Sequence, residues 1–305
     1  MNSDYIGYIP IVDCSRNYSV DENIYENIYL DITHRCNMHC SYCYNPQRLN
    51  IDMSIEYFEE VCKRLPSKVN FKLLGGEPTL HKDLFKFITI AQSYGHGVFF
   101  ASNGIKYNDI DFISGLSKLS GFYPGLSMDG GHDRNSYQTI NDSDCVDQKL
   151  KALGNLIKYD IRGICLSAVI VRGINEFTVE HLIELAKANP EHIEYIHFRN
   201  AGKVGKWVDI EPYSMDELKS IVSKYCSNRE MKPRCIGEIH CSQDSGNTCC
   251  YRFRPTNKLQ ISLVEFATAD SVNCHKRGKL LNDFTIQPFF ENMLNVSNAI
   301  QLQEY

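Results

Sequence analysis

Three cysteines lie on one short stretch of the chain, Cys36, Cys40 and Cys43, with the spacing CxxxCxxC. Three thiolates on one tight loop can hold three corners of a cubane 4Fe–4S cluster. The fourth iron then lacks a protein ligand, and an open metal position is typical of catalytic sites. The alternative is a structural zinc site that uses the three thiols with His34 or His39. Structural zinc sites usually take four ligands from paired knuckles, and a second knuckle is absent nearby.

The composition places these cysteines in an ordinary globular chain. The 305 residues are 43% hydrophobic and 23% charged, with a formal net charge of -5 and 13 cysteines. The absence of a long basic run argues against duplex DNA as a partner, and no apolar run approaches the ~20 residues of a membrane helix. The first residues, Met1–Asp4, do not resemble a signal peptide, so we expect a cytoplasmic protein. In a reducing compartment, an odd number of cysteines indicates metal or redox chemistry rather than disulfides.

The elements that must position the triplet follow an alternating pattern. Short apolar runs, often followed by Gly, Asn or Asp, alternate with amphipathic stretches, as in strand–helix units of a parallel sheet. One amphipathic stretch follows Ser54, a possible N-cap, and another opens with the capping-box pattern of Ser214–Glu217. The pattern predicts an α/β fold, a partial (β/α)6 TIM-like barrel. The expected strands are Asn27–Ile32, Asn70–Leu74, Val98–Ala101, Tyr123–Ser127, Gly163–Val169 and Ile193–Phe198.

The pattern breaks after about residue 230. Tyr251–Arg254 and Leu259–Val264 flank a Pro-Thr-Asn-Lys turn and predict a β-hairpin, and Asp283–Leu294 is a candidate last helix. We therefore expect a small cysteine-rich α+β domain at the end of the chain. The predicted division is an N-terminal segment at 1–26, the barrel at 27–230 and the C-terminal domain at 231–305.

The triplet, with aromatic Tyr42 before its last cysteine, resembles the signature of the radical S-adenosylmethionine (radical SAM) enzymes. The resemblance extends over roughly residues 27–230. It implies that Cys36, Cys40 and Cys43 bind a 4Fe–4S cluster whose open iron takes the amino and carboxylate groups of S-adenosylmethionine. It further implies reductive cleavage to a 5′-deoxyadenosyl radical that removes a hydrogen atom from a substrate, with a flavodoxin- or ferredoxin-type electron donor.

Further stretches resemble the family's cofactor motifs. Gly75-Gly76-Glu77-Pro78 ends the second expected strand, and the equivalent run in the family hydrogen-bonds the methionine amino group. Two glycines also let the backbone approach a ligand closely. The alternative is a plain strand-to-helix turn.

The next three strands carry polar residues at or near their ends. Ser102 and Asn103 resemble a TNG-type run, for which a structural turn is the alternative. Ser127 and Asp129 resemble the S-x-D-G motif, whose side chains face the ribose, and two residues apart on an extended segment they point to one side. Ser167 is a candidate cofactor contact on the fifth strand, or a buried hydroxyl. Tyr42 is expected to help pack the adenine.

The sixth expected strand leads into a basic stretch, Arg199–Lys206. Its three cations and two glycines could hold a phosphate or carboxylate. A solvated basic loop is the alternative, and the spacing is not that of a Walker loop.

The C-terminal cysteines resemble the auxiliary-cluster domains of the family, the Twitch and SPASM types. The match is incomplete, because the expected hairpin reads Ser262 where such hairpins carry a cysteine. A second iron–sulfur cluster and buried free thiols both remain open. The candidate ligands are Cys235, Cys241, Cys250 (or its neighbour Cys249) and Cys274.

The sequence thus predicts a radical SAM enzyme that acts on a ribosomally made peptide or a small natural-product metabolite. If Cys165 or Cys241 returned hydrogen to the substrate radical, the outcome would be epimerisation; no catalytic residue is chosen. One alternative is a nucleotide cyclase, because Arg252 and Arg254 alternate as in the GTP cyclase of molybdenum-cofactor synthesis. The alternative from another class is a zinc-stabilised binding module.

Overall fold

The computed structural model describes most of the chain up to residue 226 and parts of the remainder. Of residues 232–233 and 250–253 only the backbone is described. The described residues are 16–43, 45, 47–202, 206, 210–226, 232–233, 250–253, 259–264 and 277–289.

The strands expected from the sequence form the centre of one twisted parallel sheet. The order β2-β3-β4-β5-β6-β7 follows the chain, and each neighbouring pair is parallel. Sequential parallel strands with helical crossovers are the construction of α/β barrels, so the predicted partial TIM-like barrel is confirmed. The strands are β2 (Asn27–Thr33), β3 (Asn70–Gly75), β4 (Gly97–Phe100), β5 (Phe122–Ser127), β6 (Ile164–Ile170) and β7 (Ile193–Asn200).

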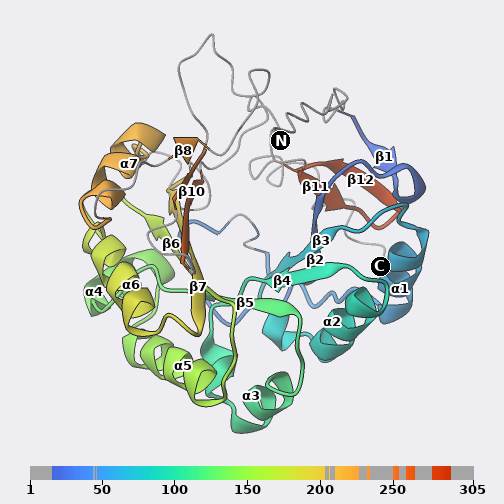
Figure 1. Ribbon diagram of the computed structural model, residues 1–305, viewed down its shortest axis with the longest axis horizontal. Helices are drawn as coiled ribbons and strands as arrows, with labels where there is room; N and C mark the ends of the chain where they lie inside the picture. Colours follow the sequence, from blue (N-terminus) through green and yellow to red (C-terminus); the bar gives the residue numbers. More distant parts are fainter. Residues whose placement is uncertain are drawn as a thin grey trace, which may run out of the picture.

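Helices cover the outside of the curved sheet (Figure 1). The expected caps are present: the Ser54 side chain accepts from the Tyr57 backbone N–H, and Ser214 and Glu217 form a complete capping box. No helix among the described residues is long and apolar enough to cross a membrane. The helices are α1 (Ile55–Arg64), α2 (Leu84–Ser93), α3 (Ile110–Leu116), α4 (Arg134–Asn141), α5 (Val146–Lys158), α6 (Phe177–Ala188) and α7 (Met215–Ser223), with 3-10 turns η1 (Val20–Glu22), η2 (Pro78–Leu80) and η3 (Ile105–Asn108).

Strands from the C-terminal region extend the sheet at both edges. β10 (Gln260–Val264) pairs in parallel with β7, and β11 (Arg277–Leu280) pairs in parallel with β2. The predicted hairpin is confirmed, because β9 (Cys250–Phe253) pairs antiparallel with β10. The sheet therefore continues across the predicted domain boundary at residue 230, and separate domains at 1–26, 27–230 and 231–305 stay a prediction. The remaining edge strands are β8 (Lys232–Pro233), β12 (Thr285–Pro288) and β1 (Tyr18–Ser19).

The prediction of a helix over Asp283–Leu294 is wrong for the described residues, which end at Phe289, because Thr285–Pro288 form the strand β12. β12 pairs antiparallel with β11 on one side and with β1 on the other. Phe284 has a φ of +60°, a left-handed conformation that ends a helix and suits a tight turn. Ile286 is buried while Thr285 and Gln287 are partly exposed, which is the two-residue period of a strand.

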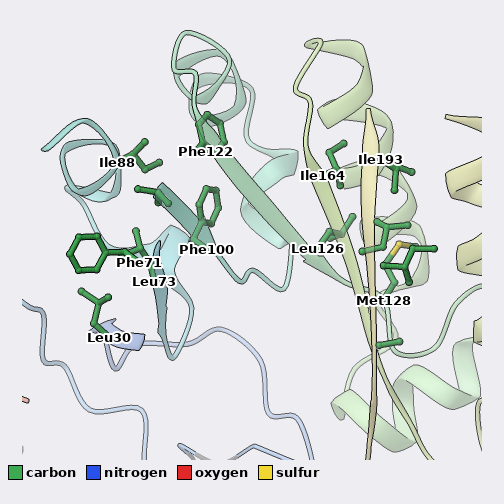
Figure 2. Close-up of a cluster of buried hydrophobic side chains, with 14 of the residues drawn as sticks. Leu30, Phe71, Leu73, Ile88, Phe100, Phe122, Leu126, Met128, Ile164 and Ile193 are labelled. Carbon is green, nitrogen blue, oxygen red and sulfur yellow. The ribbon is translucent and has the colours of Figure 1, made fainter. Parts of the chain in front are cut away.

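The main core lies between the sheet and the helices. Alternate strand residues, among them Phe71, Phe100 and Leu126, point to this side and pack with helix residues such as Ile88 (Figure 2). The intervening residues therefore face the inside of the barrel. Lys72 is one of them, and its ammonium lies 5.1 Å from the centre of the Phe99 ring.

Candidate functional site

The cysteine triplet lies on the loop that follows β2, at the carboxyl ends of the parallel strands. Cys36, Cys40 and Cys43 are partly buried and form no disulfide. Burial raises the pKa of each thiol, that of Cys40 to about 12. The described residues contain no group of three His, Cys, Asp or Glu side chains arranged around a single metal ion.

Each of the three thiols has a hydrogen-bond donor that opposes the effect of burial. These donors favour the thiolate, which is the form that binds metals and iron–sulfur clusters. The set of soft sulfur ligands on one loop therefore fits an iron–sulfur cluster. The donors are the backbone N–H of Met38 at Cys36, the side chain of Asn141 at Cys40 and the backbone N–H of Asn45 at Cys43.

The two glycines after β3 let this strand end pack directly against the start of the cysteine loop. A Cβ on Gly75 would lie 1.9 Å from the Thr33 carbonyl oxygen, and one on Gly76 would lie 2.2 Å from that of Arg35. The Gly76 N–H donates to the Thr33 carbonyl at 2.8 Å. In this structure the glycines allow contact between two backbone segments, and their predicted contact with S-adenosylmethionine stays a prediction.

Glu77 joins the ends of β3 and β4. Its backbone N–H donates to the Arg35 carbonyl at 2.7 Å, which extends the contact with the cysteine loop. The side chain is buried, and burial raises its pKa. One carboxylate oxygen accepts from the Thr79 hydroxyl at 2.6 Å and the Ser102 hydroxyl at 2.8 Å, and the other accepts from the Asn103 backbone N–H at 2.7 Å.

Asn103 continues this network back to the cysteine loop. Its side-chain amide donates to the Asn37 side-chain oxygen at 2.7 Å, and Asn37 is the residue after Cys36. The structure thus brings Glu77, Ser102 and Asn103 together as a brace under the loop. Nothing local in the sequence indicates the Asn37 contact, because its partner is 66 residues away.

Asp129 is a buried residue that contacts the later part of the loop. Its side-chain oxygens accept from the Tyr42 hydroxyl at 2.8 Å, the Val169 backbone N–H at 2.9 Å and the Asn141 amide at 2.9 Å. The predicted pair Tyr42 and Asp129 therefore lie together. Their expected contacts with the adenine and the ribose stay predictions.

Ser127 is held by a lysine that the sequence reasoning missed. Lys149, on α5, has 0% exposure, and its ammonium donates to the Ser127 carbonyl at 2.8 Å and hydroxyl at 3.2 Å. The sequence does contain an indication that Lys149 is buried, because Lys149 lies on the same apolar helical face as Val146 and Leu153. The fifth-strand candidate, Ser167, is partly exposed and pairs in register with Ser127.

The basic stretch after β7 reaches the cysteine loop. The backbone N–H of Lys206 donates to the Ser41 carbonyl at 2.8 Å, and its ammonium lies 3.4 Å from an Asp142 carboxylate oxygen. The backbone of Lys206 is thus attached to the cysteine loop, so the basic stretch is not simply a loop surrounded by solvent at this residue. Residues 203–205 lie outside the described residues.

The candidate auxiliary-cluster ligands are largely outside the described residues, as is Arg254. The backbone of Cys250 pairs with Val264 across the β9–β10 hairpin, and that of Arg252 pairs with Ser262. A second cluster stays a prediction. The cysteines not described are Cys235, Cys241, Cys249 and Cys274.

One protein-family model matches the part of the chain that contains most of this site. The family model of the radical SAM superfamily matches residues 30–186. This range includes the cysteine loop, the Gly75–Glu77 strand end and Asp129.

Curated relatives match different shares of the chain. A 7,8-dihydro-6-hydroxymethylpterin dimethyltransferase of Methanocaldococcus jannaschii is 29% identical over 58% of this chain and 36% of its own length. A probable GTP 3′,8-cyclase of Pyrococcus abyssi is 29% identical over 52% of each chain. The chain therefore spans about a third to a half of these two relatives. The GTP 3′,8-cyclase of Staphylococcus carnosus is 21% identical over 88% of this chain and 87% of its own length.

A solved structure shares the fold. SuiB of Streptococcus suis, bound to S-adenosylmethionine, superposes with a TM-score of 0.57 at 15% identity over 67% of this chain and 47% of that chain. The same protein bound to its precursor peptide SuiA gives a TM-score of 0.56. At this identity the likeness concerns the fold alone.

Proposed function

Since this chain belongs to the radical SAM superfamily, whose enzymes use a 4Fe–4S cluster and S-adenosylmethionine, we propose that Cys36, Cys40 and Cys43 are its cluster ligands. The observation that carries the proposal is the loop itself: three thiols with one hydrogen-bond donor each, inside the matched region. When bound, the cluster and S-adenosylmethionine supply a 5′-deoxyadenosyl radical that abstracts a hydrogen atom from a substrate.

The chain's own residues hold the loop in place and form the cofactor site beside it. Glu77 and Asn103 hold the start of the loop through Asn37, and Asp129 holds Tyr42 near its end. We propose that residues of this region, Ser127 among them, would hold S-adenosylmethionine beside the cluster. Holding the loop near both of its ends keeps the site preorganised, and the wall of the partial barrel limits the access of water and stray hydrogen donors.

We propose that the substrate is a nucleotide, as in the cyclase alternative, in preference to a peptide. The cyclase of Staphylococcus carnosus matches nearly the whole chain. By strand alternation, the inner face of the barrel carries Lys72, Arg199, Arg277 and Lys279, with Asp31 paired to Lys279. Lysine and arginine side chains on the inner face of a barrel are groups that can bind a phosphorylated, anionic substrate. A peptide or natural-product substrate stays a prediction, and its only support from the comparisons is a fold shared with a protein that binds a precursor peptide.

The electron that starts the reaction must come from outside the chain. A flavodoxin- or ferredoxin-type donor is our proposal, because clusters of this kind reach low potentials. A cytoplasmic location stays a prediction from the sequence, as does the absence of a duplex DNA partner.

The proposal of SAM cleavage is tested with anaerobically reconstituted protein, dithionite and S-adenosylmethionine. We expect release of 5′-deoxyadenosine by the wild type and none by the Cys36→Ala/Cys40→Ala/Cys43→Ala variant. If the triple variant released 5′-deoxyadenosine at the wild-type rate, the proposal that these three cysteines are the cluster ligands would be wrong. Addition of GTP, but not of an unrelated peptide, should increase the release and transfer deuterium from labelled GTP to 5′-deoxyadenosine.

The substrate proposal has a separate binding test. Lys72→Met should weaken GTP binding about tenfold, which is about 1.4 kcal/mol, while leaving guanosine binding unchanged. The matched control is Lys187→Met, because Lys187 lies on the outer helix α6 and pairs with Glu184. Equal GTP affinity in the wild type and the Lys72 variant would argue against a phosphate site in the barrel.

A further inference from the structure

Asn141 connects a buried carboxylate to one of the cysteine thiols. It is the last residue of α4 and is fully buried. Its side-chain nitrogen lies 2.9 Å from an Asp129 carboxylate oxygen and 3.2 Å from the Cys40 sulfur. Neither the cysteine motif nor the S-x-D-G motif contains this residue, and it lies 101 positions from Cys40.

Asp129 fixes which way the Asn141 amide points. A carboxylate can only accept hydrogen bonds, so the amide nitrogen, with its two N–H groups, must face Asp129. One N–H goes to the carboxylate, and the other is directed to the Cys40 sulfur. Asp129 is itself held by the Tyr42 hydroxyl and the Val169 backbone N–H, so the amide is oriented by a fixed group.

The end of α4 is also attached to the cysteine loop through backbone groups. The Ser41 N–H donates to the Ile140 carbonyl at 2.8 Å, and the Ser41 hydroxyl donates to the Thr139 carbonyl at 3.2 Å. These carbonyls belong to the last turn of α4, where no intrahelical donor remains for them. The Cys40–Ser41 segment and Asn141 are therefore held as one unit.

The donor at Cys40 differs in kind from the donors at the other two thiols. Cys36 and Cys43 are each contacted by a backbone N–H, which no substitution short of proline removes. Cys40 is contacted by the Asn141 side chain. Hydrogen bonds to the sulfurs of an iron–sulfur cluster are among the factors that set its reduction potential, because they stabilise the more negative reduced state.

We propose that Asn141 is a positioning residue that raises the reduction potential of the cluster through its hydrogen bond to Cys40. This inference rests on the proposed function, since it requires Cys40 to be a cluster ligand. Its consequence is that Asn141 decides how readily an outside donor delivers the electron. Asp129 contributes indirectly, by holding the amide in the donating orientation.

The test is an anaerobic redox titration of the reconstituted cluster, followed by electron paramagnetic resonance. Asn141→Leu keeps the size of the side chain and removes both N–H groups. At the potential where the wild-type cluster is half reduced, the variant should show an approximately tenfold lower ratio of reduced to oxidised cluster, which is about 59 mV for one electron. The control is Asn155→Leu on the next helix, which removes one hydrogen bond, to the Tyr107 carbonyl, and should leave the ratio unchanged.

A second variant covers the case in which Asn141→Leu does not fold because Asp129 loses a donor. In Asn141→Ser the side chain ends one bond short of the amide nitrogen, which removes the donor 3.2 Å from the Cys40 sulfur and leaves space in which a water molecule can donate to Asp129. The same fall in the reduced fraction is expected. A wild-type midpoint potential in either iron-loaded variant overturns the inference. If the wild type binds a cluster and cleaves S-adenosylmethionine, that result leaves the proposed function standing; a wild type without a cluster overturns both.

Discussion

The contact between Gly76 and the cysteine loop gives a prediction with a defined sign. In Gly76→Ala, the added Cβ would lie 2.2 Å from the Arg35 carbonyl oxygen, 2.6 Å from the Arg35 carbonyl carbon and 2.7 Å from the His34 carbonyl oxygen. All three atoms belong to the backbone, so no side chain can rotate away. The strand end or the loop must move, and Arg35 directly precedes Cys36.

The expected cost is that of overpacking a close-packed interior. Such insertions destabilise by about 1–3 kcal/mol, and this site lies at the upper end because rigid backbone surrounds it. The matched control is Gly154→Ala on α5, where an added Cβ meets nothing within 4 Å. Replacing a mid-helix glycine by alanine stabilises by about 0.5–1 kcal/mol, so the two substitutions should have opposite signs.

Urea unfolding followed by circular dichroism measures both changes, and iron content reports the effect on the loop. We expect Gly76→Ala to lower the free energy of unfolding and to reduce bound iron. Gly154→Ala should raise the free energy of unfolding and leave bound iron at the wild-type level. If Gly76→Ala unfolds at the wild-type urea concentration with full iron content, the glycine does not serve as the contact between strand end and loop.

Two further substitutions test the elements around the site. At the start of α4, the Ser136 N–H donates to Asp133 and lowers the pKa of Asp133 below 3.8. This stabilisation is present above pH 3.8 and is lost as the pH falls through the lowered pKa. The difference in melting temperature between the wild type and Asp133→Ala should therefore shrink on acidification. A difference that stays constant with pH would contradict the stabilisation of α4 by the Asp133 carboxylate. The Tyr57 hydroxyl donates to the Leu281 carbonyl and accepts from the Phe284 N–H. Tyr57→Phe should cost about 1–3 kcal/mol in urea unfolding, and no change would mean that the C-terminal strands add little to the barrel.

The central strands could be predicted because their signals are local. The run Asn70–Leu74 is short, mostly apolar and ends at glycines, and it becomes β3 with one added residue. The capping pattern of Ser214 and Glu217 likewise needs only neighbouring residues. The apolar alternation of these strands also indicates which side faces the helices.

The edges of the sheet could not be predicted, because their partners are distant in the chain. β11 joins β2 across about 250 residues in register Gly278 to Ile28, a pairing that no local pattern specifies. The helix expected at Asp283 fails for a related reason. The strand Thr285–Pro288 covers only four residues, and a two-residue period over so short a run does not distinguish a strand from a helix.

The candidate site shows the same division. The cysteine spacing locates the loop, but the function of Glu77 as a brace depends on donors from another strand. Asn141 has no sequence signal at all, since its partners come from two different loops. Lys149 does have a sequence signal: it is a charged residue on an apolar helical face, which indicates a buried polar partner.

Anaerobic determination of iron and sulfide, in the wild type and in the variant without the three loop cysteines, tests the central claim most directly. We expect the variant to lose about four iron and about four sulfide per chain relative to the wild type, whatever a second cluster contributes. An equal content of iron in both proteins, or stoichiometric zinc without iron in the wild type, would contradict it.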